Sequence, residues 1–288
     1  MKRKLAKIYT PPDQPGFLGA GHIARAVVQL PFPESDPFII LMDDMLDKQD
    51  DIPVGGPHPH AGVEIGSLYL EGELGEPEHH LKKGDFEIMM AGSGVVHTET
   101  IAEKTKLRLL QMWMSPPKKD RHALPRLQRL PAAHVPVIAD EGVNIRLYSG
   151  ALKGAASPVH TYTPLIVAEI TLQAGATTTL DIPASFNTFL YVINGSIKAG
   201  EDQQPLNQDQ VGWLDLFKDD SQSELTITAG DAGARMVLYA GKPTASEVVL
   251  HGPFVADTAE DINRLYAEYR RGKMQHILSV PEAQRITW

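Results

Sequence analysis

The chain of 288 residues contains no cysteine. It therefore has no disulfide framework and no thiolate metal site, which fits a reducing compartment. The formal net charge is −9 at pH 7, which argues against a broad surface for the phosphates of a nucleic acid. No apolar run is long enough to span a bilayer. These absences predict a cytoplasmic protein that makes no direct contact with nucleic acid or membrane.

What is present is ordinary globular material, with 42% hydrophobic and 22% charged residues, and the length suggests two domains. Short apolar or alternating runs recur between Gly, Pro, Asn and Asp, and no long helical pattern interrupts them. This pattern favours an all-β sandwich or barrel over an α/β fold. The expected strands include 38–42, 65–70, 86–90, 107–113, 166–172, 189–193 and 235–239.

Residues 115–136 carry five prolines and several charges, which is typical of a linker. The predicted domains are therefore 1–130 and 131–288. Residues 68–74, LYLEGEL, are echoed by residues 190–197, LYVINGSI, which indicates that the same hairpin is used twice. Near the C-terminus, Thr258 can cap a short helix that Gly272 can end, and we expect this helix to pack against a sheet.

Two short segments combine the residue types of a metal site. His58 and His60 flank a proline, and a second pair, His97 and Glu99, with one residue between them, begins thirty-seven residues after His60. Side chains at i and i+2 of an extended segment leave the same face, so each pair can point inward together. Three imidazoles and one carboxylate suit a transition ion such as non-haem Fe(II) and leave coordination positions open. Ordinary histidine pKa values predict that such a site loses its metal below roughly pH 6.5.

The histidines of these segments also allow a simpler interpretation as solvated loop residues. A lone H-x-H in a turn rich in Pro and Gly is more often a solvated loop, and it is the second pair that makes a site the better interpretation. His79 and His80 are adjacent, so a strand would turn them to opposite faces, and we expect a solvated pair. The predicted apolar lining of the site is Met89, Met90, Val95 and Met112.

Four motifs together are similar to the pirin family of the cupin superfamily. They are GPHPHAGVE at 56–64, YLEG at 69–72, GDF at 84–86 and AGSGVVHTE at 91–99. The late GPFV at 252–255, followed by a capped helix, resembles the pirin C-terminal segment. Two stretches depart from the family pattern, AGVE at 61–64 and EPEHHLKK at 76–83, so the rim of the pocket is altered.

The resemblance implies two tandem cupin β-barrels, with one metal in the N-terminal barrel and none in the C-terminal barrel. It places the ligands at His58, His60, His97 and Glu99, and leaves Glu64 as a supporting residue. The metal is usually iron, while nickel, copper, manganese, cobalt and zinc are alternatives.

Two functions follow from the resemblance. The first is a dioxygenase similar to quercetin 2,3-dioxygenase, which opens a flavonol ring with dioxygen and expels carbon monoxide. Glu99 would then take the substrate proton, a role that competes with simple ligation. The second is a redox-responsive regulatory protein that acts through protein partners. Oxygen uptake with a flavonol separates the two.

Overall fold

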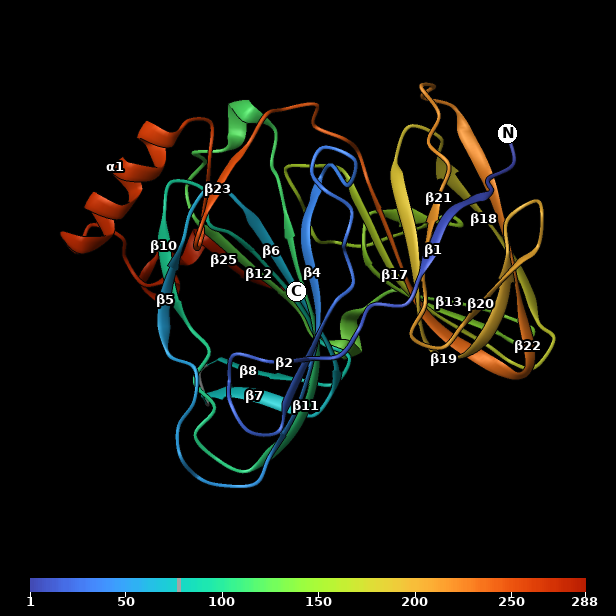
Figure 1. The fold of residues 1–288 in the computed structure, drawn as a ribbon, viewed down its shortest axis with the longest axis horizontal. Coiled ribbons are helices and arrows are strands. Elements are labelled where there is room, and N and C mark those ends of the chain that lie inside the picture. The colour runs from blue at the N-terminus through green and yellow to red at the C-terminus, as the bar shows by residue number, and fades with distance from the viewer. Residues whose placement is uncertain (77–78) are drawn as a thin grey trace. The chain divides into compact units, whose positions relative to one another are not determined.

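The computed structural model describes residues 1–76 and 79–288, and these fall into two compact units (Figure 1). One unit, the histidine domain, contains Pro12–His134 and Thr244–Trp288. The other, the companion domain, contains Met1–Pro11 and Val135–Pro243. The predicted boundary between residues 130 and 131 lies close to the observed change at residue 135, but the two chain ends do not follow the predicted division.

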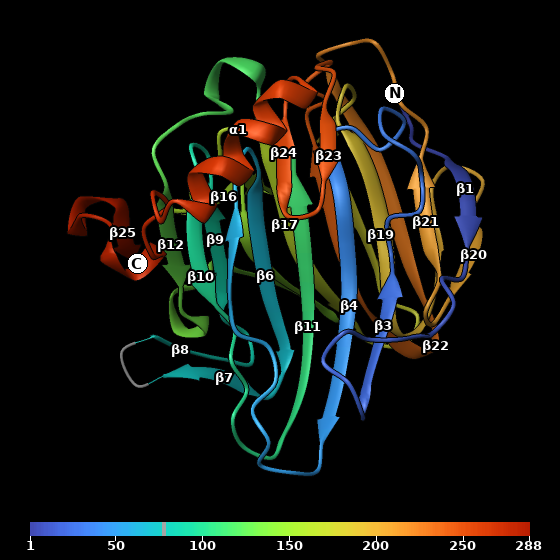
Figure 2. The same ribbon diagram turned by 60° about the vertical axis from the view of Figure 1, so that its left-hand side comes forward.

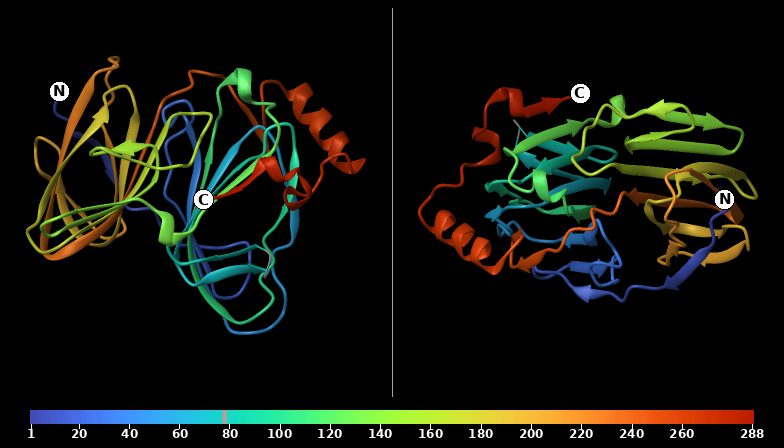
Figure 3. Two further views of the ribbon diagram at one scale, coloured as in Figure 1. Left: turned by 180° about the vertical axis from the view of Figure 1, so that it is seen from behind. Right: turned by 90° about the horizontal axis from the view of Figure 1, so that it is seen from above.

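Strand pairing at sheet edges explains why the ends belong to the opposite domains. β1 (Leu5–Tyr9) pairs antiparallel with β21 (Val211–Leu214) of the companion domain. At the other end, β25 (Arg285–Thr287) pairs in parallel with β12 (Arg126–Leu130) of the histidine domain. Figure 3 shows the red C-terminal segment beside the green strand of that domain. Such edge strands are only a few residues long, so composition does not reveal which sheet they join.

The main sheet of the histidine domain runs in the order β2-β3-β4-β11-β6-β9-β12-β25 (Figure 2). Three strand pairs accompany it: β5 with β10, β7 with β8, and β23 with β24. The remaining strands of this domain are β2 (Gln14–Pro15), β3 (His22–Ala26), β4 (Phe38–Lys48), β5 (Pro57–His60), β6 (Glu64–Glu71), β7 (Glu73–Glu76), β8 (His79–Lys82), β9 (Phe86–Met90), β10 (Val95–Thr98), β11 (Thr105–Met114), β23 (Val249–His251) and β24 (Phe254–Ala256).

The stretch predicted as a linker is only partly irregular. It contains β12, which pairs with β9 as well as β25, and a 3-10 helix at Lys118–Asp120. Leu127 and Leu130 of β12 are buried, so an apolar strand is present among the prolines. Further 3-10 helices lie at Ala132–His134, Ile277–Ser279 and Glu282–Gln284.

The predicted C-terminal helix is confirmed as α1 (Ala259–Arg270). The Thr258 hydroxyl accepts a hydrogen bond from the Asp261 backbone N–H at 3.1 Å, and Gly272 follows the helix with φ of 67°. Ile262 and Leu265 are buried. Figure 1 shows α1 on the outside of the histidine domain, beside the β23–β24 pair. The helix therefore packs on the domain that holds the histidine pairs.

The companion domain is built on a sheet with the order β1-β21-β19-β22-β17-β14-β13, to which β18 and β20 add through β22 and β19. Alternate residues of its strands point into one apolar core that includes Ile145, Ile170, Val192 and Met236. Its strands, besides β1 and β21, are β13 (Val137–Asp140), β14 (Val143–Ser149), β15 (Ala151–Leu152), β16 (Ala155–Ala156), β17 (Leu165–Leu172), β18 (Thr177–Pro183), β19 (Asn187–Ala199), β20 (Gln204–Asn207) and β22 (Gln222–Gly241). The seven segments expected as strands all lie within strands, which confirms the all-β prediction.

The repeated hairpin has a structural basis at two glycines. Gly72 and Gly195 both have φ of 75°, in the left-handed region that favours glycine. A Cβ at Gly72 would lie 2.0 Å from the Lys106 carbonyl oxygen, and one at Gly195 would lie 2.1 Å from the Gly233 carbonyl oxygen. Both glycines thus let the chain pass close to a neighbouring strand, between β6 and β7 in the histidine domain and within β19 in the companion domain. In the described ranges, no helix is long and apolar enough to cross a membrane.

Candidate metal centre

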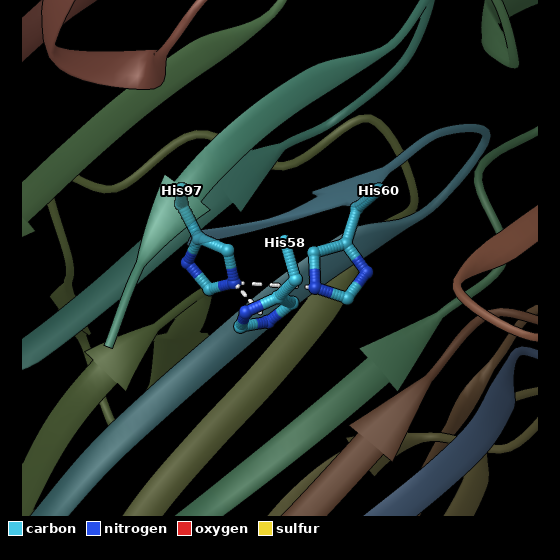
Figure 4. A group of neighbouring side chains, drawn as sticks. All are labelled: His58, His60 and His97. Carbon is cyan, nitrogen blue, oxygen red and sulfur yellow. Dashed lines mark hydrogen bonds between the residues drawn. The ribbon is translucent and has the colours of Figure 1, made fainter. Parts of the chain in front are cut away.

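Strands β5 and β10 bring the two histidine pairs together. They are antiparallel, with His97 opposite His58 and Val95 opposite His60. His58 and His60 project from one face of β5, as the i, i+2 spacing predicts, and His97 faces them across the strand pair (Figure 4). The available ring nitrogens of the three residues lie within 4.8 Å of one another. The structure therefore assembles three of the four predicted ligands into one group.

The three rings turn their Nε2 atoms toward a common point. His97 Nε2 lies 2.8 Å from His58 Nε2 and 3.1 Å from His60 Nε2. His58 Nδ1 lies 2.9 Å from the Gly56 carbonyl oxygen, so Nδ1 carries the proton and Nε2 presents a lone pair. A single proton on His97 Nε2 can satisfy only one of its two neighbours. Converging imidazole lone pairs of this kind are the donor set that a cation binds.

The spacing of these nitrogens fits a metal ion. Two nitrogen ligands about 2.1 Å from one ion and at right angles to each other lie about 3.0 Å apart, whereas tetrahedral ligands lie about 3.4 Å apart. The two separations of 2.8 and 3.1 Å match the right-angled arrangement. Both separations are therefore short enough for the nitrogens of neighbouring rings to share one metal ion.

Burial keeps two of the three imidazoles, His60 and His97, neutral. It lowers the pKa of His60 to about 3, with a further contribution from the charge of His58 and a small opposing one from the Pro253 carbonyl. Burial also holds the pKa of His97 well below the ordinary histidine value, and nearby imidazoles lower it further. Both rings thus keep a lone pair for a metal into the acid range, so we expect the metal affinity to fall less steeply below pH 6.5 than ordinary histidine pKa values predict.

Glu99 lies at the edge of this group. Its Oε2 is 3.8 Å from His58 Nε2, and its Oε1 accepts a hydrogen bond from Gln111 Nε2 at 2.8 Å. Burial raises the pKa of Glu99 to about 7, the Gln111 hydrogen bond lowers it in part, and the charges of Glu87 and Asp44 raise it. The carboxyl group can therefore hold or release a proton near neutral pH next to the imidazoles.

A cavity of about 630 Å³ opens beside His58, His60 and Glu99, and it is called the main cavity here because it borders the candidate ligands. Its walls are largely apolar, and Trp113 packs edge-on against His60 with ring centroids 4.9 Å apart. The apolar lining residues are Phe17, Leu18, Leu46, Leu74, Ile101, Leu107, Leu109 and Trp113. The polar lining residues besides the candidate ligands are His22, Asp44 and Gln111.

The predicted apolar lining was wrong for the main cavity. On β11, Leu109, Gln111 and Trp113 face the cavity, so Met112 points to the opposite face of the strand and is fully buried. Met90 and Val95 are also buried away from it, while Met89 lines a second cavity of about 90 Å³. The methionine-rich segments thus fill the core.

The second cavity contacts Glu99 from another side and is also lined by His97 and Tyr69. His79 and His80, which were expected to form a solvated pair, lie in two different environments. His79 lines this cavity and its Nε2 lies 2.9 Å from Glu87 Oε2, whereas His80 is exposed and lies 3.5 Å from Glu73. Pro77 and Glu78 of the altered rim lie outside the described residues. Glu64 is buried at the start of β6, in keeping with a supporting role.

Sequence reasoning missed Gln111, Trp113, His22 and Asp44. The alternation LRLLQMW on β11 places a polar Gln111 on a face that is otherwise apolar, and this was an available signal. His22 and Asp44 gave no such signal in the sequence, because they are separated by 22 residues and approach only when β3 pairs with β4.

Comparison with known proteins agrees with the motifs. A family model described as pirin matches residues 25–114, and one described as the pirin C-terminal cupin domain matches residues 167–275. The chain is 32% identical to pirin from Rattus norvegicus, over 83% of this chain and 82% of the relative. It is 28% identical to a Pseudomonas aeruginosa protein named "Putative quercetin 2,3-dioxygenase", over 76% of this chain and 78% of the relative.

Solved structures show the same fold. A crystal structure of a Geobacillus kaustophilus protein aligns with a TM-score of 0.76 and 28% identity, covering 86% of this chain and 99% of that chain. Quercetin 2,3-dioxygenase from Acinetobacter baumannii aligns with a TM-score of 0.83 and 24% identity, covering 96% and 100%. The predicted pair of cupin domains is thereby confirmed.

Proposed function

Because this chain belongs to the pirin family, we propose that it is a metal-dependent dioxygenase that resembles quercetin 2,3-dioxygenase and opens a flavonol ring with dioxygen. The observation that carries the proposal is the convergence of three imidazole Nε2 atoms beside a largely apolar cavity of about 630 Å³. Cavities of this size and character bind small, mostly apolar ligands. A relative named for that activity supports the same substrate class.

In this proposal His58, His60 and His97 hold the metal, with Glu99 as the fourth ligand or as a base beside it. The three imidazoles and the nearby carboxylate favour Fe(II), with nickel, copper, manganese, cobalt and zinc as alternatives. When bound, such an ion supplies Lewis acidity and redox capacity to substrate oxygens. The companion domain holds no metal in this proposal, and the protein acts in the cytoplasm.

Glu99 is the proposed catalytic residue. A pKa near 7 suits a group that takes the proton of the 3-hydroxyl of a flavonol at neutral pH and returns it to the product carboxylate. In the overall reaction both atoms of dioxygen enter the ring-opened ester, and one ring carbon leaves as carbon monoxide. The apolar walls, which include Leu109, Ile101 and Trp113, orient the planar substrate and exclude water.

The regulatory alternative draws on one observation. The side chain of His58 is 37% exposed, so a change at the imidazole group lies near the surface and can affect a docked protein. The negative net charge favours action through a protein partner over direct contact with DNA.

Oxygen uptake tests the proposal. The protein is loaded anaerobically with iron, and separately with nickel, copper, manganese and cobalt, and is then mixed with quercetin and oxygen. We expect stoichiometric oxygen uptake and release of carbon monoxide. Failure of every fully loaded form to cleave any flavonol would overturn the dioxygenase function and favour the regulatory one.

A further inference from the structure

A second polar group lies in the main cavity, away from the imidazoles. His22, at the start of β3, and Asp44, on β4, both line this cavity. His22 Nε2 lies 2.9 Å from Asp44 Oδ1. The His22 side chain is fully buried, and 16% of the Asp44 side chain is exposed. The pair is therefore built into the wall with its acid toward the cavity.

The backbone fixes which atom of His22 carries the proton. The Leu18 N–H donates a hydrogen bond to His22 Nδ1 at 3.1 Å, so Nδ1 must present a lone pair. In the neutral ring the proton then sits on Nε2 and is donated to Asp44 Oδ1. A carboxylate has about four acceptor positions. Among the described residues, His22 is the one side chain that donates a hydrogen bond to Asp44, so acceptor capacity remains on the acid.

Strand register places Asp44 at a distance from the metal group. Along the cavity face of β11, Trp113 contacts His60, Gln111 holds Glu99, and Leu109 lies opposite Asp44. At about 3.4 Å per residue, the level of Asp44 is about 7 Å beyond Gln111 and about 14 Å beyond Trp113. The shorter span, from the level of Gln111 and its partner Glu99, is comparable to the separation between the 3-hydroxyl of a flavonol and the hydroxyls of a remote ring.

The apolar surroundings of Asp44 favour a ligand that places a hydroxyl, and not a C–H group, beside the carboxylate. Leu46, Leu107 and Leu109 belong to one buried apolar cluster that borders the same part of the cavity. In such a setting a hydroxyl that reaches the carboxylate gains a hydrogen bond to a charged group, whereas a C–H at the same place leaves the acid unsatisfied.

We propose that Asp44 accepts a hydrogen bond from a substrate hydroxyl remote from the metal, with His22 as its positioning residue, so that the pair selects polyhydroxylated aromatic substrates. The inference deepens the proposed function and rests on it for the orientation of the substrate. The opposing reading is that the pair only fixes the loop at Phe17 and Leu18, since His22 contacts both residues.

Anaerobic ligand binding decides between these readings. Iron-loaded wild type and Asp44→Asn are titrated with quercetin and with 3-hydroxyflavone, which lacks the remote hydroxyls. The amide turns an N–H donor toward the cavity while its oxygen accepts from His22. We expect the affinity for quercetin to fall roughly tenfold or more, and that for 3-hydroxyflavone to change far less. Asp44→Ser serves as a second variant, and His22→Gln should reduce the same preference.

Asp47→Asn is the matched control, because Asp47 lies on β4 but is exposed and outside the cavity lining. It should change neither affinity. Equal weakening of both ligands by Asp44→Asn, or no weakening, would overturn the inference in favour of a loop-fixing role. Binding with the expected preference but without oxygen uptake would refute the dioxygenase function alone. No binding of either flavonol by wild type would refute both.

Discussion

Gln111 donates a hydrogen bond from Nε2 to Glu99 Oε1 at 2.8 Å, and this contact leaves Glu99 Oε2 turned toward His58, 3.8 Å from its Nε2. Gln111 reaches Glu99 from β11, whereas Glu99 follows directly after β10. A hydrogen bond to the ionised carboxyl stabilises the charged form, so Gln111 lowers the pKa that burial raises. Strand β11 thus supplies the residue that lowers the pKa of Glu99, and strand β10 leads directly into Glu99 and sets its position.

Replacing Gln111 by leucine should raise the pKa of Glu99 above its value of about 7, because burial then acts without the opposing hydrogen bond. If Glu99 is the base, the acid limb of the pH profile of kcat/KM for oxygen uptake should move to higher pH. Gln49→Leu, at an exposed position, is the control and should leave the profile in place. An unchanged acid limb in Gln111→Leu would argue against Glu99 as the titrating base.

One transition metal should bind per chain, at the group formed by His58, His60 and His97. Elemental analysis should show that His58→Ala combined with His97→Ala removes it, because one imidazole cannot hold the ion alone. His122→Ala, at an exposed histidine, should leave the metal content unchanged. Full retention of metal by the double variant would place the site elsewhere.

The metal affinity should fall less steeply with decreasing pH than that of a site built from three ordinary histidines. Burial lowers the pKa of His60 to about 3 and that of His97 well below its ordinary value, so protons do not compete for these rings in mild acid. Chelator competition between about pH 6.5 and pH 4.5 should therefore show an affinity that falls with fewer than three protons per metal. A dependence on the third power of the proton concentration would contradict the buried, neutral state of these rings.

The change Glu99→Gln should reduce turnover more than it reduces metal content. The amide keeps the size and the contact to Gln111 but cannot take a proton, so a chemical role predicts a fall in kcat of roughly 100-fold or more. Oxygen uptake per bound metal gives the measurement, and Glu103→Gln at an exposed site is the control. Loss of activity in strict proportion to loss of metal would identify Glu99 as a ligand only.

A side chain at Gly62 should destabilise the histidine domain. Its φ is 71°, and a Cβ there would lie 1.9 Å from the Val255 carbonyl oxygen. Gly272 has φ of 67° but nothing within 4 Å of its Cβ position, so it shares the backbone strain without the collision. Gly62→Ala should lower the free energy of unfolding by about 1 to 3 kcal/mol more than Gly272→Ala does. Equal losses in denaturant titrations would show that the contact with Val255 relaxes at no cost.

The sequence determined those features that depend on residues close together along the chain. The alternating apolar runs specified strands, so that the run 86–90 coincides with β9. The cap at Thr258 and the stop at Gly272 specified α1. The spacing of His58 and His60 put both rings on one face of β5, because the side-chain period of an extended chain is two.

Only the tertiary structure decided which segments meet. The register that sets His97 opposite His58 joins strands 39 residues apart. The same holds for the approach of Gln111 to Glu99, for the pairing of His22 with Asp44, and for the joining of each chain end to the opposite domain. The pairing of distant strands depends on the summed burial and hydrogen bonding of the whole sheet, which no short stretch of sequence contains. The candidate ligands could therefore be predicted, whereas the residues that tune them and shape the cavity could not.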